Sequence, residues 1–375
     1  MNADAKKLNL VEAYHYGLIK PNKPLLCPLY DVEGRLLANQ GTVLDAEQAV
    51  TILQYGKLLT PESKLMEAVR HINSVNNKED EQYVRYHFPT SLQQIKDVGR
   101  ELTDILIGDD NDKAKSILKL AEKITRLCHA KSDALIASLF IEGRKGTFVH
   151  HAIACAVLAE LCAVQLEWDI EERMPLVAAA LTMDAFLFIN NKPHLSETKH
   201  PEESAEMLDQ WGVDDQKWLT YVRQHHEQVD GSGFPNGLKD RELKWGSVIL
   251  TALNSYCESV FGYSGEELKT PKHAISILFN QREHPLFFMV AEVLLRIVGF
   301  FPIGTMVKLK NGETGLVVSN GQHVDSPNVK ALIDKDGDWW KMPATRNTSS
   351  PLYTVDKEIH IDMLMFNIDF SQFWR

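Results

Sequence analysis

The most informative stretch of the sequence is residues 225–238, which read HHEQVDGSGFPNGL. A helical pattern around Trp218 and Val222 leads into the paired histidines His225 and His226. Neighbouring residues on a helix point about 100° apart, so both imidazoles can reach one site only where the helix ends or where two metals are served. The glycines that follow allow a sharp turn and a close approach of the backbone to a ligand. The stretch therefore predicts a helix C-terminus followed by a loop that is either ligand-binding or purely structural.

Helical patterns extend on both sides of this stretch. From residue 91 to residue 300, apolar residues recur at spacings of three and four, as at Leu92, Ile95 and Val98. A region of ~200 residues suits a single helical domain. The most apolar segment, 286–301, is interrupted by charged residues and falls short of the ~20 apolar residues that span a bilayer. We therefore expect a buried helix there and no membrane span.

Short strand-like segments flank the helical region. Residues 1–70 contain two apolar runs, 24–30 and 35–38, that are arranged like a hairpin, with a helical pattern at 44–53. Residues 71–90 are polar and predict a linker or a loosely packed helix. Beyond residue 301, Asn311-Gly312 separates two alternating runs, a strong hairpin signal, and further strand-like runs lie at 329–333 and 363–368. The predicted fold class is mainly α, a multihelical bundle (91–300) with small β-containing modules at the N-terminus (1–70) and the C-terminus (301–375).

Composition narrows the functional classes. The 375 residues exceed the ~250–300 at which one core stops growing, which favours several domains. Lys and Arg number 40 against 51 Asp and Glu, a net charge of −11 that disfavours binding to a nucleic-acid polymer. The 5 cysteines lack CxxC spacing, so we expect neither a disulfide framework nor a Cys-based zinc site, and we expect a reducing cytoplasm.

The quoted stretch resembles the signature of HD-GYP domains, bacterial phosphodiesterases that open cyclic di-GMP. Phe234 stands where that family has the Tyr of its Gly-Tyr-Pro. Upstream, His200-Pro201 resembles the family's His-Pro helix start and His151 its first His, although His150 precedes it. The resemblance covers roughly residues 145–320 and implies an HD-type multihelical bundle in bacterial signalling.

The resemblance also implies a centre of imidazoles and carboxylates that binds divalent metal, such as Fe or Mn, and clamps a phosphodiester. Carried over residue by residue, the implied metal ligands are His151, Asp184, His200, His225, His226 and Asn254. The implied dinucleotide-binding residues are Asp230, Gly231, Gly233, Phe234 and Pro235. Three flanking cations, Arg223, Lys239 and Arg241, can hold phosphate, or they can form a solvated rim.

Several positions depart from the family pattern. Met183 stands in place of the His of the His-Asp pair, Leu187 in place of a Lys, and Asn254 in place of an Asp. Val248 replaces an Arg, and Thr147 a carboxylate. Losing one preorganised charge costs ~10²–10³ in rate. We therefore assign no catalytic residue and expect a degenerate HD-GYP-like protein with little or no hydrolysis.

The expected role is a receptor for cyclic di-GMP or a related dinucleotide, or a module that binds a protein partner, with a single divalent metal. An active metal-dependent phosphodiesterase with a reduced metal site is the alternative. A scaffold that binds neither metal nor nucleotide is a third.

Overall fold

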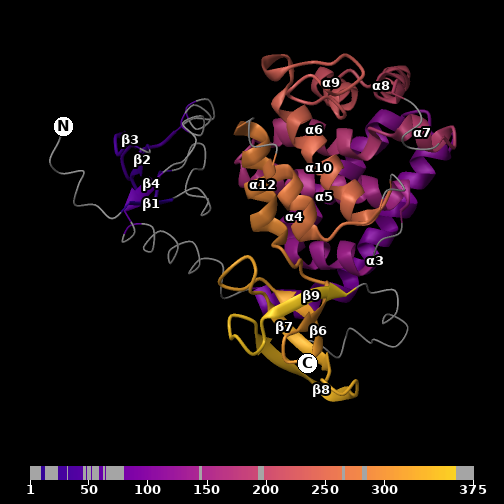
Figure 1. The fold of residues 1–375 in the computed structure, drawn as a ribbon. Helices are drawn as coiled ribbons and strands as arrows, with labels where there is room; N and C mark the ends of the chain where they lie inside the picture. The colour runs from indigo at the N-terminus through magenta and orange to yellow at the C-terminus, as the bar shows by residue number, and fades with distance from the viewer. Residues whose placement is uncertain are drawn as a thin grey trace. The chain divides into compact units, whose positions relative to one another are not determined.

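The structure is a computed structural model, shown in Figure 1. It describes residues 10–12, 24–31, 33–44, 48, 52, 59–61, 64, 80–142, 146–192, 198–263, 267–280 and 285–359. The predicted strand at 363–368 and most of the predicted helix at 44–53 lie outside these residues. The chain divides into two compact units, Met1–Glu79 with Ala163–Trp168, and Asp80–Cys162 with Asp169–Arg375.

The first unit carries a small antiparallel sheet. Its strands are β1 (Leu10–Glu12), β2 (Leu29–Tyr30), β3 (Leu36–Ala38) and β4 (Leu59–Pro61), in the order β1-β4-β2-β3. The predicted hairpin is confirmed, because β2 pairs with β3. Its turn is held by Asp31, whose carboxylate accepts the N–H groups of Glu33 and Arg35 at 2.9 and 2.8 Å.

The second unit is a bundle of helices, as the sequence predicts. They are α3 (Asp80–Ile107), α4 (Lys113–Glu142), α5 (Phe148–Gln165), α6 (Ile170–Thr182), α7 (Ala185–Ile189), α8 (His200–Gln210), α9 (Gln216–Gln224), η3 (Asp240–Glu242), α10 (Trp245–Phe261), α11 (Pro271–Asn280) and α12 (Pro285–Val298). Helix α3 begins at Asp80 rather than at residue 91, so the last part of the segment predicted as a linker or a loosely packed helix is helical. The Lys113 ammonium closes its C-terminus by donating to the carbonyls of Ile105, Leu106 and Gly108.

Helix α5 runs through the middle of the bundle and carries His151. It is apolar on nearly every side and rich in alanine, which lets neighbouring helices approach closely. Within the described residues it is the one helix with the length and hydropathy of a membrane span, and 78% of that window is buried inside the protein. Burial of this kind is typical of the central helix of a bundle.

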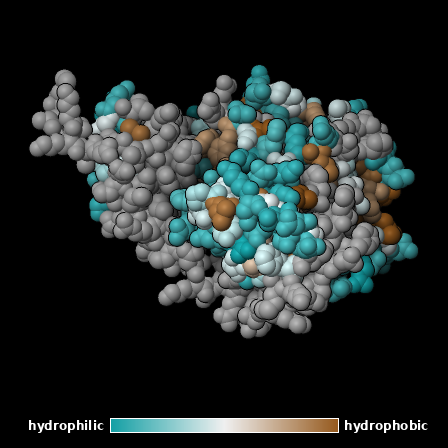
Figure 2. Space-filling model, turned by 60° about the horizontal axis from the view of Figure 1, so that its bottom comes forward, coloured by the Kyte–Doolittle hydropathy of each residue, from teal (hydrophilic) through white to brown (hydrophobic). Residues whose placement is uncertain are grey.

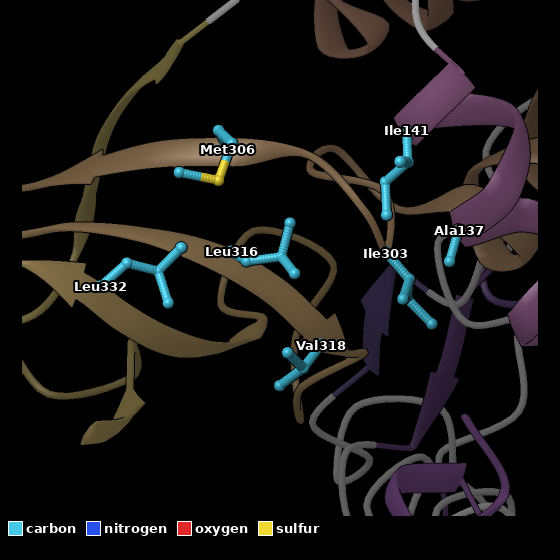
Figure 3. Packing of buried hydrophobic residues seen from close by; sticks show 7 residues of the cluster. All are labelled: Ala137, Ile141, Ile303, Met306, Leu316, Val318 and Leu332. Atoms are coloured by element: carbon cyan, nitrogen blue, oxygen red, sulfur yellow. The ribbon is translucent and has the colours of Figure 1, made fainter. Parts of the chain in front are cut away.

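The C-terminal part of the second unit is a five-stranded antiparallel sheet. Its strands are β5 (Met306–Leu309), β6 (Thr314–Ser319), β7 (Asn328–Ile333), β8 (Trp339–Asn347) and β9 (Val355–Ile359), in the order β8-β7-β6-β5-β9. The predicted Asn-Gly hairpin is confirmed between β5 and β6, with Gly312 at φ +91°. Figure 3 shows how Ala137 and Ile141 of α4 meet Ile303 and Met306, which joins the sheet to the bundle.

The face of the molecule in Figure 2 is largely hydrophilic where it is coloured. Its hydrophobic residues lie in small separate spots, which is normal for a protein surface. An ion pair lies across the C-terminal sheet: Arg346 Nε is 2.7 Å and Nη2 2.6 Å from the two carboxylate oxygens of Glu313. Hydrogen bonds from Arg346 lower the pKa of Glu313 most, against an opposing effect of burial.

Replacing Glu313 by Gln should cost roughly 2–4 kcal/mol of local stability, because the guanidinium of Arg346 loses its charged partner in a nearly buried place. Since the folded pKa of Glu313 is lowered, this contribution is present above the unfolded pKa of ~4.3 and is lost as pH falls towards the folded value. Native-state hydrogen exchange of β6 amides at pH 7 and near pH 3.5 measures both effects. The exposed Asp336→Asn is the control, and an equal cost at both pH values would contradict the assignment.

Candidate metal centre

Four side chains from distant parts of the sequence bring ligand-type atoms together in the helical unit. Asp184, His200, His225 and His226 place these atoms within 4.8 Å of one another. His200 Nε2 lies 3.1 Å from Asp184 Oδ1 and 3.2 Å from His225 Nε2. His225 Nε2 lies 3.4 Å from the same carboxylate oxygen. One carboxylate and three imidazoles therefore surround a common point.

The spacing of these atoms suits one metal ion. Two ligand atoms bound about 2.1 Å from an ion, at right angles to each other, are about 3.0 Å apart. The separations of 3.1, 3.2 and 3.4 Å between Asp184 Oδ1 and the Nε2 atoms of His200 and His225 are close to this value. A set of imidazole nitrogens with a carboxylate oxygen suits Fe, Mn or a similar divalent ion. The group could therefore hold a metal.

The protonation of His225 favours this role. Its Nδ1 lies 2.6 Å from the carbonyl oxygen of Val222, and because a carbonyl only accepts, Nδ1 carries the hydrogen. Burial lowers the pKa of His225 and outweighs the opposing effect of the Asp184 carboxylate. The neutral ring then presents the lone pair of Nε2 towards Asp184 and His200, as a metal-ligating histidine does.

The two histidines of the 225–226 pair reach the site because α9 ends at Gln224. His225 is the residue that follows the helix, so the constraint predicted for adjacent histidines inside a helix is relieved there. At its other end α9 is capped by Asp215, whose carboxylate accepts the N–H groups of Lys217 and Trp218 at 2.8 and 3.1 Å. His200 is the first residue of α8, where the following proline needs no hydrogen-bond partner.

Asp184 lies at the junction between α6 and α7. The preceding Thr182 accepts a hydrogen bond from the indole Nε1–H of Trp218 at 2.9 Å and donates to the carbonyl of Ala178 at 2.7 Å. Trp218 is buried on α9, so this bond ties the end of α6 to the helix that His225 directly follows. The hydrogen bond between Thr182 and Trp218 thus fixes the position of Asp184 relative to His225.

The loop after His226 folds back over that residue. Phe234 stacks on the His226 ring, with centroids 4.5 Å apart and planes at 18°, and its N–H donates to the carbonyl of His226 at 3.2 Å. A Cβ on Gly233 would lie 2.2 Å from the backbone N of Gln228, so this position requires glycine. Pro235 follows Phe234 through a cis peptide bond.

The two remaining predicted metal ligands, His151 and Asn254, lie beside the four-residue group. His151 Nε2 donates to Asn254 Oδ1 at 2.7 Å, and Asn254 Nδ2 donates to Glu258 Oε1 at 3.1 Å. His151 Nε2 is also 4.0 Å from Asp184 Oδ2. The preceding His150 faces elsewhere, with its Nε2 3.2 Å from the carbonyl of Leu139.

The predicted dinucleotide-binding residues lie on the same loop but outside the four-residue group. Asp230 accepts the N–H and O–H of Ser232 at 2.8 and 2.6 Å, which lowers the pKa of Asp230. Gly231, at φ +80°, packs against the side chain of Lys239. Lys239 and Arg241 are exposed and Arg223 is half-buried.

Side chains to which the sequence analysis assigned no role in the site lie around His151 and Asn254. Tyr263 stacks on His151 with ring centroids 4.8 Å apart, and burial, together with the charges of Asp184 and Glu258, raises the pKa of its hydroxyl. Cys155 Sγ lies 3.6 Å from His151 Nε2. Spacing could have pointed to two of them, since Cys155 follows His151, and Glu258 follows Asn254, by one helical turn.

Parts of this chain are similar to known proteins. Residues 193–287 match the family model described as HD domain, a range that includes His200, His225, His226 and Asn254. Cyclic di-GMP phosphodiesterase PA4108 of Pseudomonas aeruginosa is 25% identical over 139 residues, which is 36% of this chain and 33% of that protein. The match thus spans about a third of that relative's length.

Among solved structures, Bd1817, a HDG"Y"P protein from Bdellovibrio bacteriovorus, aligns with a TM-score of 0.46 and 16% identity, covering 76% of this chain and 99% of that one. The predicted resemblance is confirmed in part: residues 193–287 match an HD domain, and part of the chain is distantly similar to a cyclic di-GMP phosphodiesterase. That the chain is a degenerate member stays a prediction.

Proposed function

We propose that this chain is a degenerate HD-GYP-like protein of bacterial cyclic di-GMP signalling. It holds a single divalent ion on Asp184, His200, His225 and His226, and acts as a receptor or protein-interaction module with little or no hydrolysis. The convergence of these four side chains within 4.8 Å is the observation that carries the proposal. The cytoplasm is the expected location. A protein partner is expected to bind the chain when the dinucleotide is bound to it.

Support for a single ion comes from the other side of Asp184. There, the hydrogen bonds from His151 to Asn254 and from Asn254 to Glu258 occupy the groups that would serve a second ion. Because Nε2 of His151 donates its hydrogen to an amide oxygen, it offers no lone pair to a metal in this arrangement. The neighbouring Met183 is 1% exposed and brings only a soft, weak thioether donor.

Support for little or no hydrolysis comes from charge and access. Leu187 is buried where the family has a Lys, and Val248 is buried where it has an Arg, so neither position offers a cation to a reacting phosphate. Asp184 and His225 are 0% exposed and His200 is 1% exposed. When bound at such a centre, a divalent ion supplies either Lewis-acid polarisation or a structural cross-link. Metal sites whose ligands all come from the protein, with no position left for substrate, are typical of structural ions.

The dinucleotide is proposed from the similarity to the named phosphodiesterase and from the cations beside the loop. Arg223, Lys239 and Arg241 are described cations near the signature that could pair with phosphates. Because the chain carries a net charge of −11, local cations near the site would favour binding of a dianion.

Two assays of the purified 375-residue chain test this function. With added Mn²⁺ or Fe²⁺, hydrolysis of cyclic di-GMP should be roughly 10³-fold or more slower than by an HD-GYP phosphodiesterase with all its charged site residues, since several preorganised charges are absent. Calorimetry should detect binding of cyclic di-GMP, and the triple change of Arg223, Lys239 and Arg241 to Ala should weaken it. Absence of heat at high micromolar dinucleotide would remove the receptor role.

The second candidate is an active phosphodiesterase with a reduced metal site, favoured by the similarity to the Pseudomonas enzyme. Clear turnover that disappears in His225→Ala would establish it in place of our proposal. His129, which is half exposed on α4, provides the control: His129→Ala should leave turnover unchanged.

A further inference from the structure

Glu227, the third residue of the His-His-Glu run, lies outside the four-residue metal group although it directly follows two of its members. Its carboxylate is buried, with the residue 1% exposed. Oε1 accepts the N–H of Asn236 at 2.6 Å and Oε2 accepts the N–H of Leu238 at 2.9 Å. Both oxygens are therefore used to hold the far end of the loop that starts at Gln228.

The part of the loop that precedes these two anchor points lies on His226. Phe234 stacks on the imidazole and its N–H bonds to the His226 carbonyl, while Gly233 packs directly on the backbone of Glu227 and His226. His226 is the member of the metal group that is half-buried, whereas Asp184, His200 and His225 are buried. The ring of Phe234 thus covers the member that has the most contact with solvent.

We infer that Glu227 is a positioning residue that acts through the loop to hold Phe234 over His226 and to limit access to the metal group. A buried carboxylate is costly to desolvate, and two charge-assisted hydrogen bonds to backbone N–H groups offset that cost only while the loop is closed. Glu227→Gln removes the charge and turns an amide NH₂ towards a backbone N–H. The loop should then open more often.

The test measures the chemical accessibility of His226 in the 375-residue chain prepared without metal. Diethyl pyrocarbonate modifies accessible neutral imidazoles, and fragmentation of the peptide separates His226 from His225. In Glu227→Gln, modification of His226 should become about tenfold faster, the effect expected when one charge-assisted hydrogen bond is lost. The exposed His129 calibrates the reagent, and the buried His150 reports any general unfolding.

Three further variants sharpen the result. Phe234→Ala should raise the reactivity of His226 about as much as Glu227→Gln, and Phe234→Tyr, which keeps the stacked ring, should not. Glu242→Gln is the matched control: Glu242 also accepts a backbone N–H at the end of this loop, from Lys239 at 2.9 Å, but it is exposed. We expect no change in this variant.

Unchanged His226 reactivity in Glu227→Gln would overturn the inference, and so would a rise shared equally by His150. The metal aspect rests on the proposed function, so it has its own measurement: transfer of bound Mn²⁺ to a chelator should be faster in Glu227→Gln. If the purified wild-type chain binds no metal, but His226 still becomes more reactive in Glu227→Gln, the proposed function is refuted and the role of Glu227 is retained.

Discussion

The Asp184→Asn variant should contain less than about a tenth of the metal of the wild-type protein, because Asp184 is the only carboxylate in the four-residue group and its charge offsets the ion's. The variant should also lose the stabilisation that added metal gives, about 2.7 kcal/mol when free metal is at one hundred times its dissociation constant. Metal analysis by plasma mass spectrometry and thermal unfolding with and without Mn²⁺ measure the two effects.

Asp209→Asn is the matched control for this variant, since Asp209 is an exposed aspartate in the last turn of α8. It should keep the metal content and the metal-dependent shift of the wild-type protein. Equal metal content in Asp184→Asn and the wild type would show that the ion, if present, is bound elsewhere.

The double substitution of Met183→His with Asn254→Asp should raise the metal content from about one ion per chain towards two. The two oxygens of Asp184 face different sides, since Oδ1 is 3.1 Å from His200 and Oδ2 is 4.0 Å from His151. Asn254→Asp replaces the amide oxygen beside His151 by a carboxylate that can bind a metal, and Met183→His adds an imidazole next to Asp184 in the sequence. A bridging carboxylate would then serve two ions.

Asn254→Asp alone is the informative comparison, because it places a second carboxylate beside Glu258 without the new imidazole. We expect this single variant to lose stability in the absence of metal and to regain it with Mn²⁺, through like-charge repulsion and its relief. No gain in metal content in the double variant would mean that these positions do not face the site.

The parts of the fold that depend on local patterns could be predicted from the sequence. The hairpin at Asn311-Gly312 follows from turn chemistry, and the helical bundle follows from apolar spacing. The start of α3 could not be placed, because residues 80–90 mix charged residues with Tyr83, Val84, Tyr86 and Phe88 and contain Pro89, so no regular apolar stripe marks the helix. The pairing of Glu313 with Arg346 joins distant strands and left no local signal.

The candidate site likewise has features that the sequence could predict and features that depend on tertiary packing. The sequence could single out His225 and His226, because a helix that ends at a paired histidine is a local feature. The hydrogen bonds from His151 through Asn254 to Glu258, and the stacking of Tyr263, depend on how α5 packs against α10 and the residues that follow it. Glu227 is recognisable in the sequence as part of the signature. Its role in anchoring the loop is evident only from the hydrogen bonds that it accepts from two backbone N–H groups.

The most direct test of the proposed metal site is the number of metal ions bound per wild-type chain. Plasma mass spectrometry measures this number on protein purified without chelator and supplied with Mn²⁺ or Fe²⁺. We predict about one ion per chain, lost in Asp184→Asn and retained in Asp209→Asn. A wild-type chain that holds no ion under these conditions would contradict the account, and a chain that holds two would contradict the single-ion site.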